Sequence, residues 1–312
     1  MKTKTEIVKR KRSRKKFANI DLHLMIAPAV IYFIIFAYLP MFGLIIAFKN
    51  YNYTDGILFS PWCGFDNFKF LFESGNAWML TRNTILYNIA FLVTSIALEV
   101  ILAVFLSEIA GKKIKKLCQS IMILPNFISW VVIAVFAYSF LNFETGVINR
   151  ILINLGHDPI QFYAEVGAWK YILVFVNLWK GAGYGSIIYL ATITGMDTSV
   201  YEAAEIDGAN AWQRIRHITL PLLTPTIVTM SLLSIGRLLR GNFDMFYQLI
   251  GNNGMLYEST DIIDTYIFRA LLSSPNIGMS SAVGFLQSAL CFIIILVVNK
   301  AVKMYEKDYA LF

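Results

Sequence analysis

The chain has 312 residues, of which 57% are hydrophobic and only 15% are charged, and its mean hydropathy is +0.59. A water-soluble domain of this size does not need so much apolar side chain, because its surface must be wetted, so the composition excludes an ordinary soluble protein. The formal net charge of +7 also occurs in nucleic-acid-binding proteins, but its distribution along the chain favours a different explanation. We therefore predict an all-α membrane protein that crosses the bilayer several times.

The chain begins with a basic tail, residues 1–20, and we expect the remainder, residues 21–312, to form one membrane domain. Apolar stretches long enough to cross a bilayer contain about 20 helical residues. Six such stretches are predicted, near residues 22–48, 83–108, 117–141, 168–195, 219–243 and 280–302. The first stretch is about twice as long as the core of a signal peptide and lacks a small-residue cleavage site, so we expect it to remain as a span.

Lysine and arginine concentrate in alternate segments between the predicted spans. They fill the tail and recur at 112–116, at Arg214 and Arg216, and at 300–307, whereas the intervening loops 49–82, 142–167 and 244–279 hold fewer. The positive-inside rule then predicts that both termini lie on the cytoplasmic side of the membrane. The loops on the opposite side are too short for a separate catalytic domain.

Several predicted spans contain residues that interrupt helices. Pro28 and Pro40 lie in the first span, Pro125 lies in the third, and residues 180–185 form a glycine-rich stretch in the fourth. Irregular backbone at membrane depth is tolerated where protein or a wet cavity covers it, which favours a transporter. Ordinary kinked packing is the alternative, because glycine and proline are common in membrane helices.

A polar segment, Glu202 to Pro221, separates the fourth and fifth spans. Ser199 and Glu202 have the spacing of a capping box, which predicts a short helix that ends at Gly208. Asn210 is a good N-cap for a second helix, with Gln213 three residues later. We therefore predict a helix–turn–helix hairpin over residues 199–220 on the cytoplasmic surface, with one apolar side formed by Ile206, Ala209, Trp212, Ile215 and Ile218.

This segment resembles the EAA loop of the permease subunits of ABC importers. The family motif E-A-A-x-x-x-G, followed by I-x-L-P, is matched by Glu202, Ala203, Ala204, Gly208, Ile218, Leu220 and Pro221. Segments such as GFDNFKFLF, ILPNFISWVV and the final MYEKDYALF resemble the LplB-type branch of carbohydrate-uptake permeases, which is similar to the MalF side of maltose-type systems. The resemblance covers nearly the whole chain and implies the type I importer fold.

The resemblance also implies a function and a set of partners. The chain would take up oligosaccharides by alternating access and would have no ATPase site of its own. Its partners would be a second permease, two cytoplasmic ATPase subunits that bind ATP and magnesium, and an extracytoplasmic sugar-binding lipoprotein. The hairpin would dock into the ATPase, which assigns coupling roles to Glu202, Ala203, Ala204, Asp207, Gly208, Ile215, Leu220 and Pro221.

The sugar path should be wet and lined by polar groups inside the later spans. Candidates are Lys180, Tyr184, Arg237, Arg240, Asn242 and Asp244. A lone charge at the bilayer centre costs roughly 3 kcal/mol, so such residues usually face a cavity or a partner. Arg237 and Arg240 share a helical face and suit an acidic or heavily hydroxylated glycan. The alternative is that both pair with Asp244 or with the second permease near the outer interface. Three aromatic residues can stack on sugar rings or simply pack: Tyr87, Trp130 and Trp179.

Two other functions compete with this interpretation. A secondary transporter or channel needs carboxylates in mid-span for ion coupling, and Glu99 is the one clear example. A membrane enzyme acting on lipid-linked sugar needs clustered acids, histidines or a metal, but His23, His157 and His217 are scattered along the chain. Neither alternative explains the polar hairpin.

Overall fold

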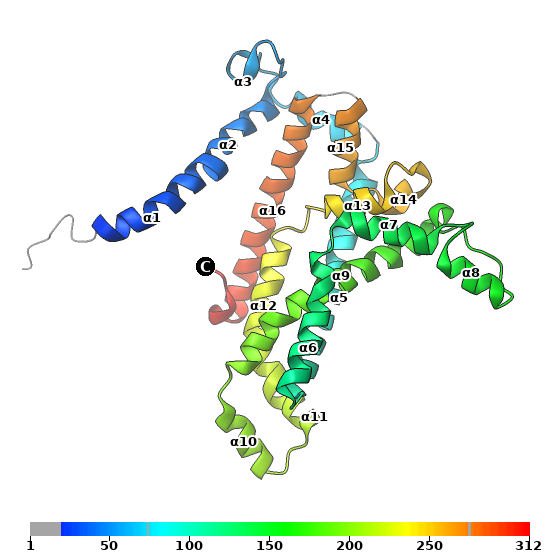
Figure 1. Cartoon of the computed structure of the whole chain (residues 1–312). Coiled ribbons are helices and arrows are strands. Elements are labelled where there is room, and N and C mark those ends of the chain that lie inside the picture. The colour runs from blue at the N-terminus through cyan, green and yellow to red at the C-terminus, as the bar shows by residue number, and fades with distance from the viewer. Residues whose placement is uncertain (1–19, 74, 274–275) are drawn as a thin grey trace, which may run out of the picture.

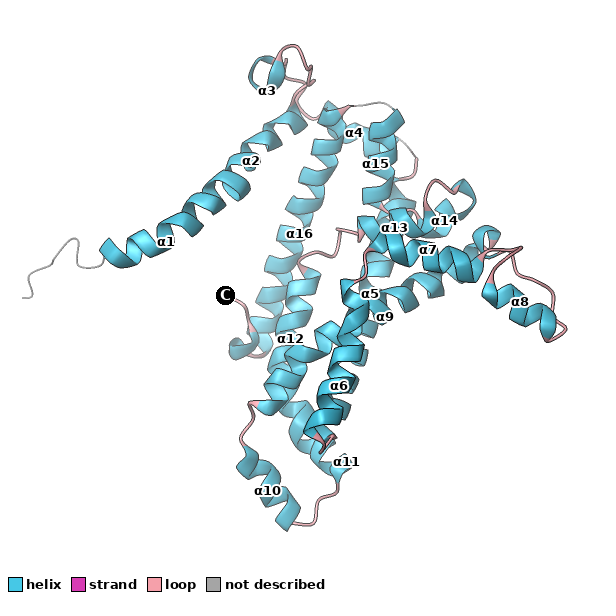
Figure 2. Ribbon diagram, in the orientation of Figure 1, coloured by secondary structure: helices cyan, strands magenta, loops and turns pink. Residues whose placement is uncertain are grey.

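The computed structural model describes residues 20–73, 75–273 and 276–312, so the predicted basic tail lies almost entirely outside the described residues. Within these ranges the secondary structure is helical, and no strand is formed apart from an isolated bridge between Lys49 and Trp62 (Figure 2). The predicted all-α class is therefore confirmed.

The first predicted span is a single rod that extends away from the other helices (Figure 1). It is continuous from residue 23 to residue 48 and contains both predicted prolines. A π-helical turn stands directly before Pro40, where the missing N–H and the bulky ring prevent regular α-helical bonding. The rod consists of α1 (Ile20–Phe33), η1 (Ile34–Tyr38), α2 (Leu39–Met41) and η2 (Phe42–Phe48).

The remaining long helices form the body of the molecule. Four described helices are long and apolar enough to cross a membrane, and a bent helix pair makes a fifth candidate. The fourth predicted span corresponds to α9, which has 29 residues but is not among these candidates, since polar residues between 177 and 185 lower its hydropathy. Besides the rod, the long elements are α5 (Ala77–Glu108), the pair α6 (Lys112–Ile123) with η3 (Leu124–Phe127) and α7 (Trp130–Leu141), α9 (Val166–Thr194), α12 (Leu220–Ile235) and α16 (Ile277–Tyr305).

Short helices fill the connections. Figure 1 shows α3, α4 and α15 at one end of the molecule and α10 at the other. The polar segment therefore projects from the end opposite the longer loops. The short helices are α3 (Gly56–Phe59), α4 (Asp66–Glu73), α8 (Val147–Asn154), η4 (Phe162–Ala164), α10 (Thr198–Ile206), α11 (Ala211–Arg214), η5 (Ile215–Thr219), α13 (Phe243–Ile250), η6 (Gly254–Leu256), α14 (Tyr257–Thr260), α15 (Ile263–Ser273) and η7 (Lys307–Tyr309).

Interruptions were predicted in the first, third and fourth spans, whereas the described residues show breaks in the third and fifth. At Pro125 the third span bends by 94° between α6–η3 and α7, as its sequence indicates. The glycine-rich stretch 180–185 lies inside the unbroken α9, so the predicted break there is wrong. The fifth span was predicted to reach residue 243, but α12 ends at Ile235 and an irregular segment, residues 236–242, follows it.

The glycines of α9 serve close packing instead of a break. A β-carbon at Gly183 would overlap the Met122 carbonyl of α6, and one at Gly185 would overlap the Glu99 carboxylate of α5. Small residues let membrane helices approach closely, which matters because lipid offers no hydrophobic drive for helix association. Sequence alone did not separate this use of glycine from a helix break.

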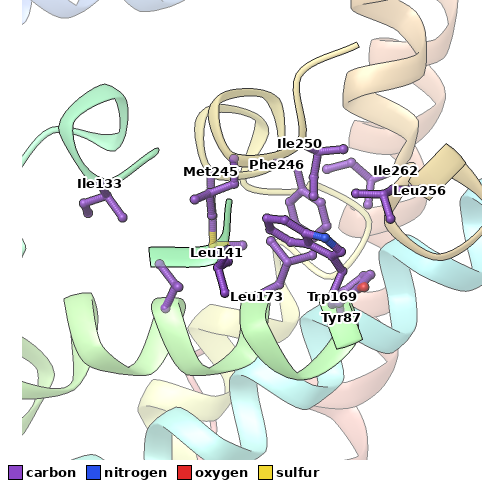
Figure 3. Close-up of a cluster of buried hydrophobic side chains, with 12 residues drawn as sticks. Tyr87, Ile133, Leu141, Trp169, Leu173, Met245, Phe246, Ile250, Leu256 and Ile262 are labelled. Carbon is purple, nitrogen blue, oxygen red and sulfur yellow. The ribbon is translucent and has the colours of Figure 1, made fainter. Parts of the chain in front are cut away.

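A cluster of buried hydrophobic side chains joins α5, α7, α9 and α13 (Figure 3). Trp169 is fully buried, and its indole N–H donates to the Phe162 carbonyl at 2.8 Å. The Tyr87 hydroxyl donates to the Ser259 carbonyl at 2.9 Å, and its ring meets Phe246 edge-on. Tyr87 therefore packs in the core, the alternative to sugar stacking.

The two α9 glycines Gly181 and Gly183 allow a matched test of this packing. Gly183→Ala must push against backbone of α6, which should destabilise the protein by about 1–3 kcal/mol, the usual cost of overpacking. Gly181→Ala meets no atom within 4 Å and should be neutral or slightly stabilising because alanine favours helix. Thermal unfolding of the purified protein should rank Gly183→Ala lowest, and equal stability of the two variants would contradict the assignment.

Candidate functional site: a braced hairpin and a cavity

The polar segment forms a hairpin, residues 197–219, whose first arm is α10. The N-cap is Asp197, which accepts the Ser199 backbone N–H at 2.9 Å, and this bond holds the pKa of Asp197 below its ordinary value. Ser199 lies inside the helix, so the predicted capping box of Ser199 with Glu202 is wrong. The physical reason is that Asp197, two residues earlier, is the N-cap and accepts the backbone N–H of Ser199 itself. The Glu202 carboxylate is exposed and is not used for capping.

The turn of the hairpin is a Schellman motif. Gly208 has φ of +78°, a left-handed conformation that a side chain rarely adopts. The N–H of Gly208 donates to Glu205, and the N–H of Ala209 donates to Ala204 at 2.9 Å. These two bonds satisfy the last free carbonyls of α10, which fixes the direction of the chain leaving the helix. The predicted turn at Gly208 is confirmed.

The second arm continues directly into a membrane span. Asn210 is the N-cap of the second helix, as predicted, and it forms a capping box with Gln213: each side-chain oxygen accepts the other residue's backbone N–H, at 2.9 Å and 2.8 Å. No break follows, because α11, η5 and α12 form one helix from Ala211 to Ile235. Leu220 and Pro221 thus belong to the span. The hairpin is consequently a rigid extension of α12.

Two side-chain contacts brace the arms against each other. The Arg214 guanidinium contacts the Glu205 carboxylate at 2.5 Å and approaches the Glu108 carboxylate, at the end of α5, to 3.9 Å. The Tyr201 hydroxyl lies 3.0 Å from the hydroxyl of buried Thr219. The brace formed by Arg214, Glu205 and Glu108 links both arms to a third helix. This role was not predicted from the sequence, although oppositely charged residues nine positions apart across a turn are a usable signal.

The outer surface of the hairpin combines an acid with exposed apolar side chains. Glu202 and Ala203 are exposed, Ile206 is 88% exposed and Trp212 is 68% exposed. Ile215 instead packs with the buried cluster that includes Leu223. The predicted single apolar side is therefore wrong: Ile206 and Trp212 face outward, whereas Ile215 faces the helices. Exposed large apolar residues beside a charge are typical of a docking surface for another protein.

A cavity of about 860 Å³ lies between α5, α9, α12 and the irregular segment 236–242. Polar side chains enter it from every one of these elements. On α5 they recur at seven- and four-residue spacing, which places them on one helical face. The polar lining comprises Asn88, Ser95, Glu99, Asn177, Tyr189, Ser234, Arg237, Arg240 and Asn242. The Tyr189 hydroxyl is buried and has no hydrogen-bond partner among the described residues.

The irregular segment 236–242 is held by side chains from neighbouring helices. Asn88 donates to the carbonyls of Leu238 and Arg240, at 2.9 Å and 3.1 Å. The buried Gln287 amide donates to the Leu239 carbonyl at 2.8 Å, and Asp264 accepts the Gly241 N–H at 2.8 Å. Backbone groups without a helical partner are costly at membrane depth, so these amides and the carboxylate permit the break.

Three of the six predicted path residues line this cavity: Arg237, Arg240 and Asn242. The Arg240 guanidinium donates to Ser288 at 2.8 Å, and neither arginine has a carboxylate within ion-pair distance among the described residues. The predicted alternative, a pairing with Asp244, is therefore wrong within this chain. Asp244 is exposed in the first turn of α13 and does not line the cavity.

Lys180 and Tyr184 also lie outside the cavity. The Lys180 ammonium donates to the carbonyls of Ile128, Asn126 and Pro125, at 2.5, 2.9 and 3.5 Å, and lies 5.1 Å from the Trp130 ring centre. It thus satisfies the free carbonyls at the 94° bend of the third span, where the helix ends abruptly. Tyr184 is 54% exposed on α9.

Comparison with known proteins identifies the family. Residues 99–303 match the model for the binding-protein-dependent transport system inner membrane component. The chain belongs to this family. Membership in a family of inner-membrane transport components agrees with the apolar spans, and it favours binding-protein-dependent transport over the secondary transporter and the membrane enzyme considered above.

Individual relatives agree with this family. The chain is 33% identical to protein LplB of Bacillus subtilis, over 92% of this chain and 90% of the relative. It is 34% identical to the polygalacturonan/rhamnogalacturonan transport system permease protein YteP of the same species, over 92% of this chain and 89% of the relative. The chain also matches a solved structure of a bacterial alginate ABC transporter in complex with its alginate pentasaccharide-bound periplasmic protein. The TM-score is 0.83 and the sequence identity 33%, and the match covers 95% of this chain and 99% of the solved chain. The predicted resemblance to LplB-type carbohydrate permeases is confirmed.

The brace can be tested by comparing two neighbouring arginines. Arg214→Gln removes the contacts with Glu205 and Glu108 and should loosen α10, raising amide hydrogen exchange across residues 198–209 by about fivefold to tenfold. Arg216→Gln removes the same charge from an exposed position and should leave the exchange unchanged. Equal exchange in both variants, measured by mass spectrometry, would show that the brace does not hold the hairpin.

Proposed function

We propose that this chain is the transmembrane permease subunit of an ATP-driven importer that takes up oligosaccharides delivered by an extracytoplasmic binding lipoprotein. The observation that carries the proposal is the braced hairpin in a member of this family: it is rigid, it projects from one end of the helices, and it presents Glu202 with the exposed Ile206 and Trp212. A rigid projecting element suits the transfer of motion between subunits.

The chain itself supplies no ATP chemistry in this proposal. Two companion ATPase subunits bind ATP and magnesium in the cytoplasm, and a second, related permease completes the membrane part. Both termini and the hairpin then lie on the cytoplasmic side, as the distribution of lysine and arginine predicts. The binding lipoprotein meets the opposite end, where α3, α4 and α15 lie (Figure 1).

The connections of the hairpin suggest how motion reaches the cavity. The first arm follows α9 after a three-residue link, the second arm continues into α12, and Arg214 reaches Glu108 at the end of α5. These three helices are the ones that line the cavity. A displacement of the hairpin by the ATPase therefore acts on three cavity walls together, which is what alternating access requires.

We further propose that the preferred cargo carries carboxylates. Arg237 and Arg240 line the cavity without an ion-pair partner among the described residues, and guanidinium groups bind carboxylates in a bidentate manner. Glu99 lines the same cavity and contributes the opposite charge, so the cationic preference is local to segment 236–242. Transporters of alginate, which is an acidic polysaccharide, and of polygalacturonan are among the similar proteins.

Replacing the exposed acid tests the coupling role of the hairpin. Glu202→Lys reverses the charge on the docking surface without removing a contact within α10, so we expect uptake to fall at least tenfold while membrane insertion and the yield of the chain stay normal. The assay is uptake of labelled oligosaccharide by cells that produce all subunits. Glu144→Lys, an equal change at an exposed residue between α7 and α8, is the control. Unchanged uptake with Glu202→Lys would refute the docking role.

A second test addresses the acidic cargo. In the complete reconstituted importer, Arg237→Gln with Arg240→Gln should raise the KM for an oligouronate about tenfold and change the KM for a neutral oligosaccharide little. Basal ATP hydrolysis should stay normal, because neither arginine touches the hairpin. Arg150→Gln, on the exposed surface of α8, is the control. An equal loss with both sugars would contradict charge recognition while leaving the importer assignment intact.

A further inference from the structure

A second groove lies outside the cavity, between the ends of α5 and α9 that are far from the hairpin. Its volume is about 520 Å³, and two cations, Arg82 and Lys170, line it. Each cation lies in the first two turns of its helix, at the end of a membrane span. This groove contributes nothing to the path or to the hairpin, so its charges need a separate explanation.

The floor of the groove is polar, but its groups are already bonded. Asn83 donates to the carbonyls of Glu258 and Asp261, at 3.1 Å and 3.0 Å. The Tyr87 hydroxyl donates to Ser259, whose own hydroxyl donates to Val166 at 2.9 Å. These bonds join α5, α9 and α14 into a fixed base. The polar groups of the floor therefore hold the shape of the groove, and the donors that could bind a ligand are the two cations at its rim, Arg82 and Lys170.

The two cations on the rim have no acidic partner within ion-pair distance among the described residues. Arg82 makes one weak contact, at 3.3 Å, with the Asn83 side-chain oxygen. Glu258 also lines the groove, but it stands beyond 4.0 Å from both cations. Arg82 and Lys170 are exposed and together carry one charge more than Glu258 can neutralise, which favours an anionic ligand.

Below the cations the groove becomes apolar. On α5, Leu86 and Ala90 follow Arg82 at four-residue intervals, and on α9 Val174 follows Lys170 in the same way. This spacing keeps each series on one helical face, so a cation at the end of each span is followed by apolar side chains toward its middle. Leu86 is 59% exposed and Tyr171 is 79% exposed, so the groove faces outward.

We infer that this groove binds an anionic phospholipid, with its phosphate between Arg82 and Lys170 and an acyl chain along Leu86, Ala90 and Val174. A phosphate accepts hydrogen bonds from arginine and lysine. An acyl chain matches the apolar stripe, whereas a sugar would need polar groups there. Val93 and Phe175, exposed at 61% and 67%, continue the apolar surface toward the middle of the spans. The order of charge and apolar surface matches the order of headgroup and hydrocarbon in a bilayer.

The test is retention of phosphatidylglycerol by the complete importer, purified with its companion subunits from bilayers of phosphatidylcholine and phosphatidylglycerol. Native mass spectrometry counts the bound lipid as the phosphatidylglycerol fraction is varied. Arg82→Gln with Lys170→Gln should weaken the tightest retained phosphatidylglycerol about tenfold, because each lysine or arginine near the headgroups adds to the attraction. The matched control is Lys69→Gln with Arg150→Gln, which removes two exposed cations outside the groove.

A crosslinking amino acid at Leu86 provides an independent readout that a folding defect would not imitate. Capture of phosphatidylglycerol at this position, reduced in the Arg82→Gln, Lys170→Gln background, supports the inference. Equal lipid retention by the double variant and its control would overturn it. Capture of the second permease or of the binding protein at Leu86 would also overturn it, because the groove would then be a protein interface.

Discussion

The brace between Arg214, Glu205 and Glu108 is the contact on which the architecture of this protein depends. Without it, α10 would be held by a three-residue link, by the turn at Gly208 and by the contact between the Tyr201 and Thr219 hydroxyls. With it, α10, α11 and the end of α5 are connected, because Arg214 of α11 lies 2.5 Å from the Glu205 carboxylate and 3.9 Å from the Glu108 carboxylate. Arg214 is only 20% exposed, so water screens these contacts less than at an open surface.

Side chains from neighbouring helices also hold the non-helical segment 236–242 at the cavity. A wall that includes broken helix exposes carbonyl and N–H groups that lipid cannot satisfy. Here Asn88, Gln287 and Asp264 bond these groups from three different helices. The segment that carries Arg237 and Arg240 is therefore fixed in position without being helical, and neither cation has a carboxylate within ion-pair distance among the described residues. In the proposed importer, a rigid cavity wall and a rigid hairpin would confine motion to whole helices.

Local patterns in the sequence predicted the turn and the second N-cap of the hairpin, but not its first N-cap or the direction in which its apolar side chains face. The capping box of Asn210 with Gln213 and the turn at Gly208 depend on neighbouring residues, which sequence shows directly. The role of Gly183 depends on Met122, which is distant in the chain, so a glycine needed for packing resembled a helix break.

Long-range partners explain the other misses. Lys180 satisfies carbonyls near Pro125, over fifty residues away, and so it lies outside the cavity where its charge suggested a path. No proline marks the break after Ile235 in the sequence. The side-chain amides that permit this break come from Asn88 of α5 and Gln287 of α16. The proposed function, in contrast, was inferred from the resemblance of one short motif, Glu202 to Pro221, to the EAA loop of ABC importer permeases.

The central claim is that the hairpin and the attached end of α5 move as one body. Spin labels at Ile206 in the hairpin and at Phe105 in α5, both exposed, report their separation by pulsed electron resonance in the complete complex. Between the nucleotide-free and ATP-trapped states, this separation should stay constant within about 2 Å, while the distance from Ile206 to the companion permease changes. A change in the Ile206–Phe105 separation as large as the change to the companion would contradict the claim.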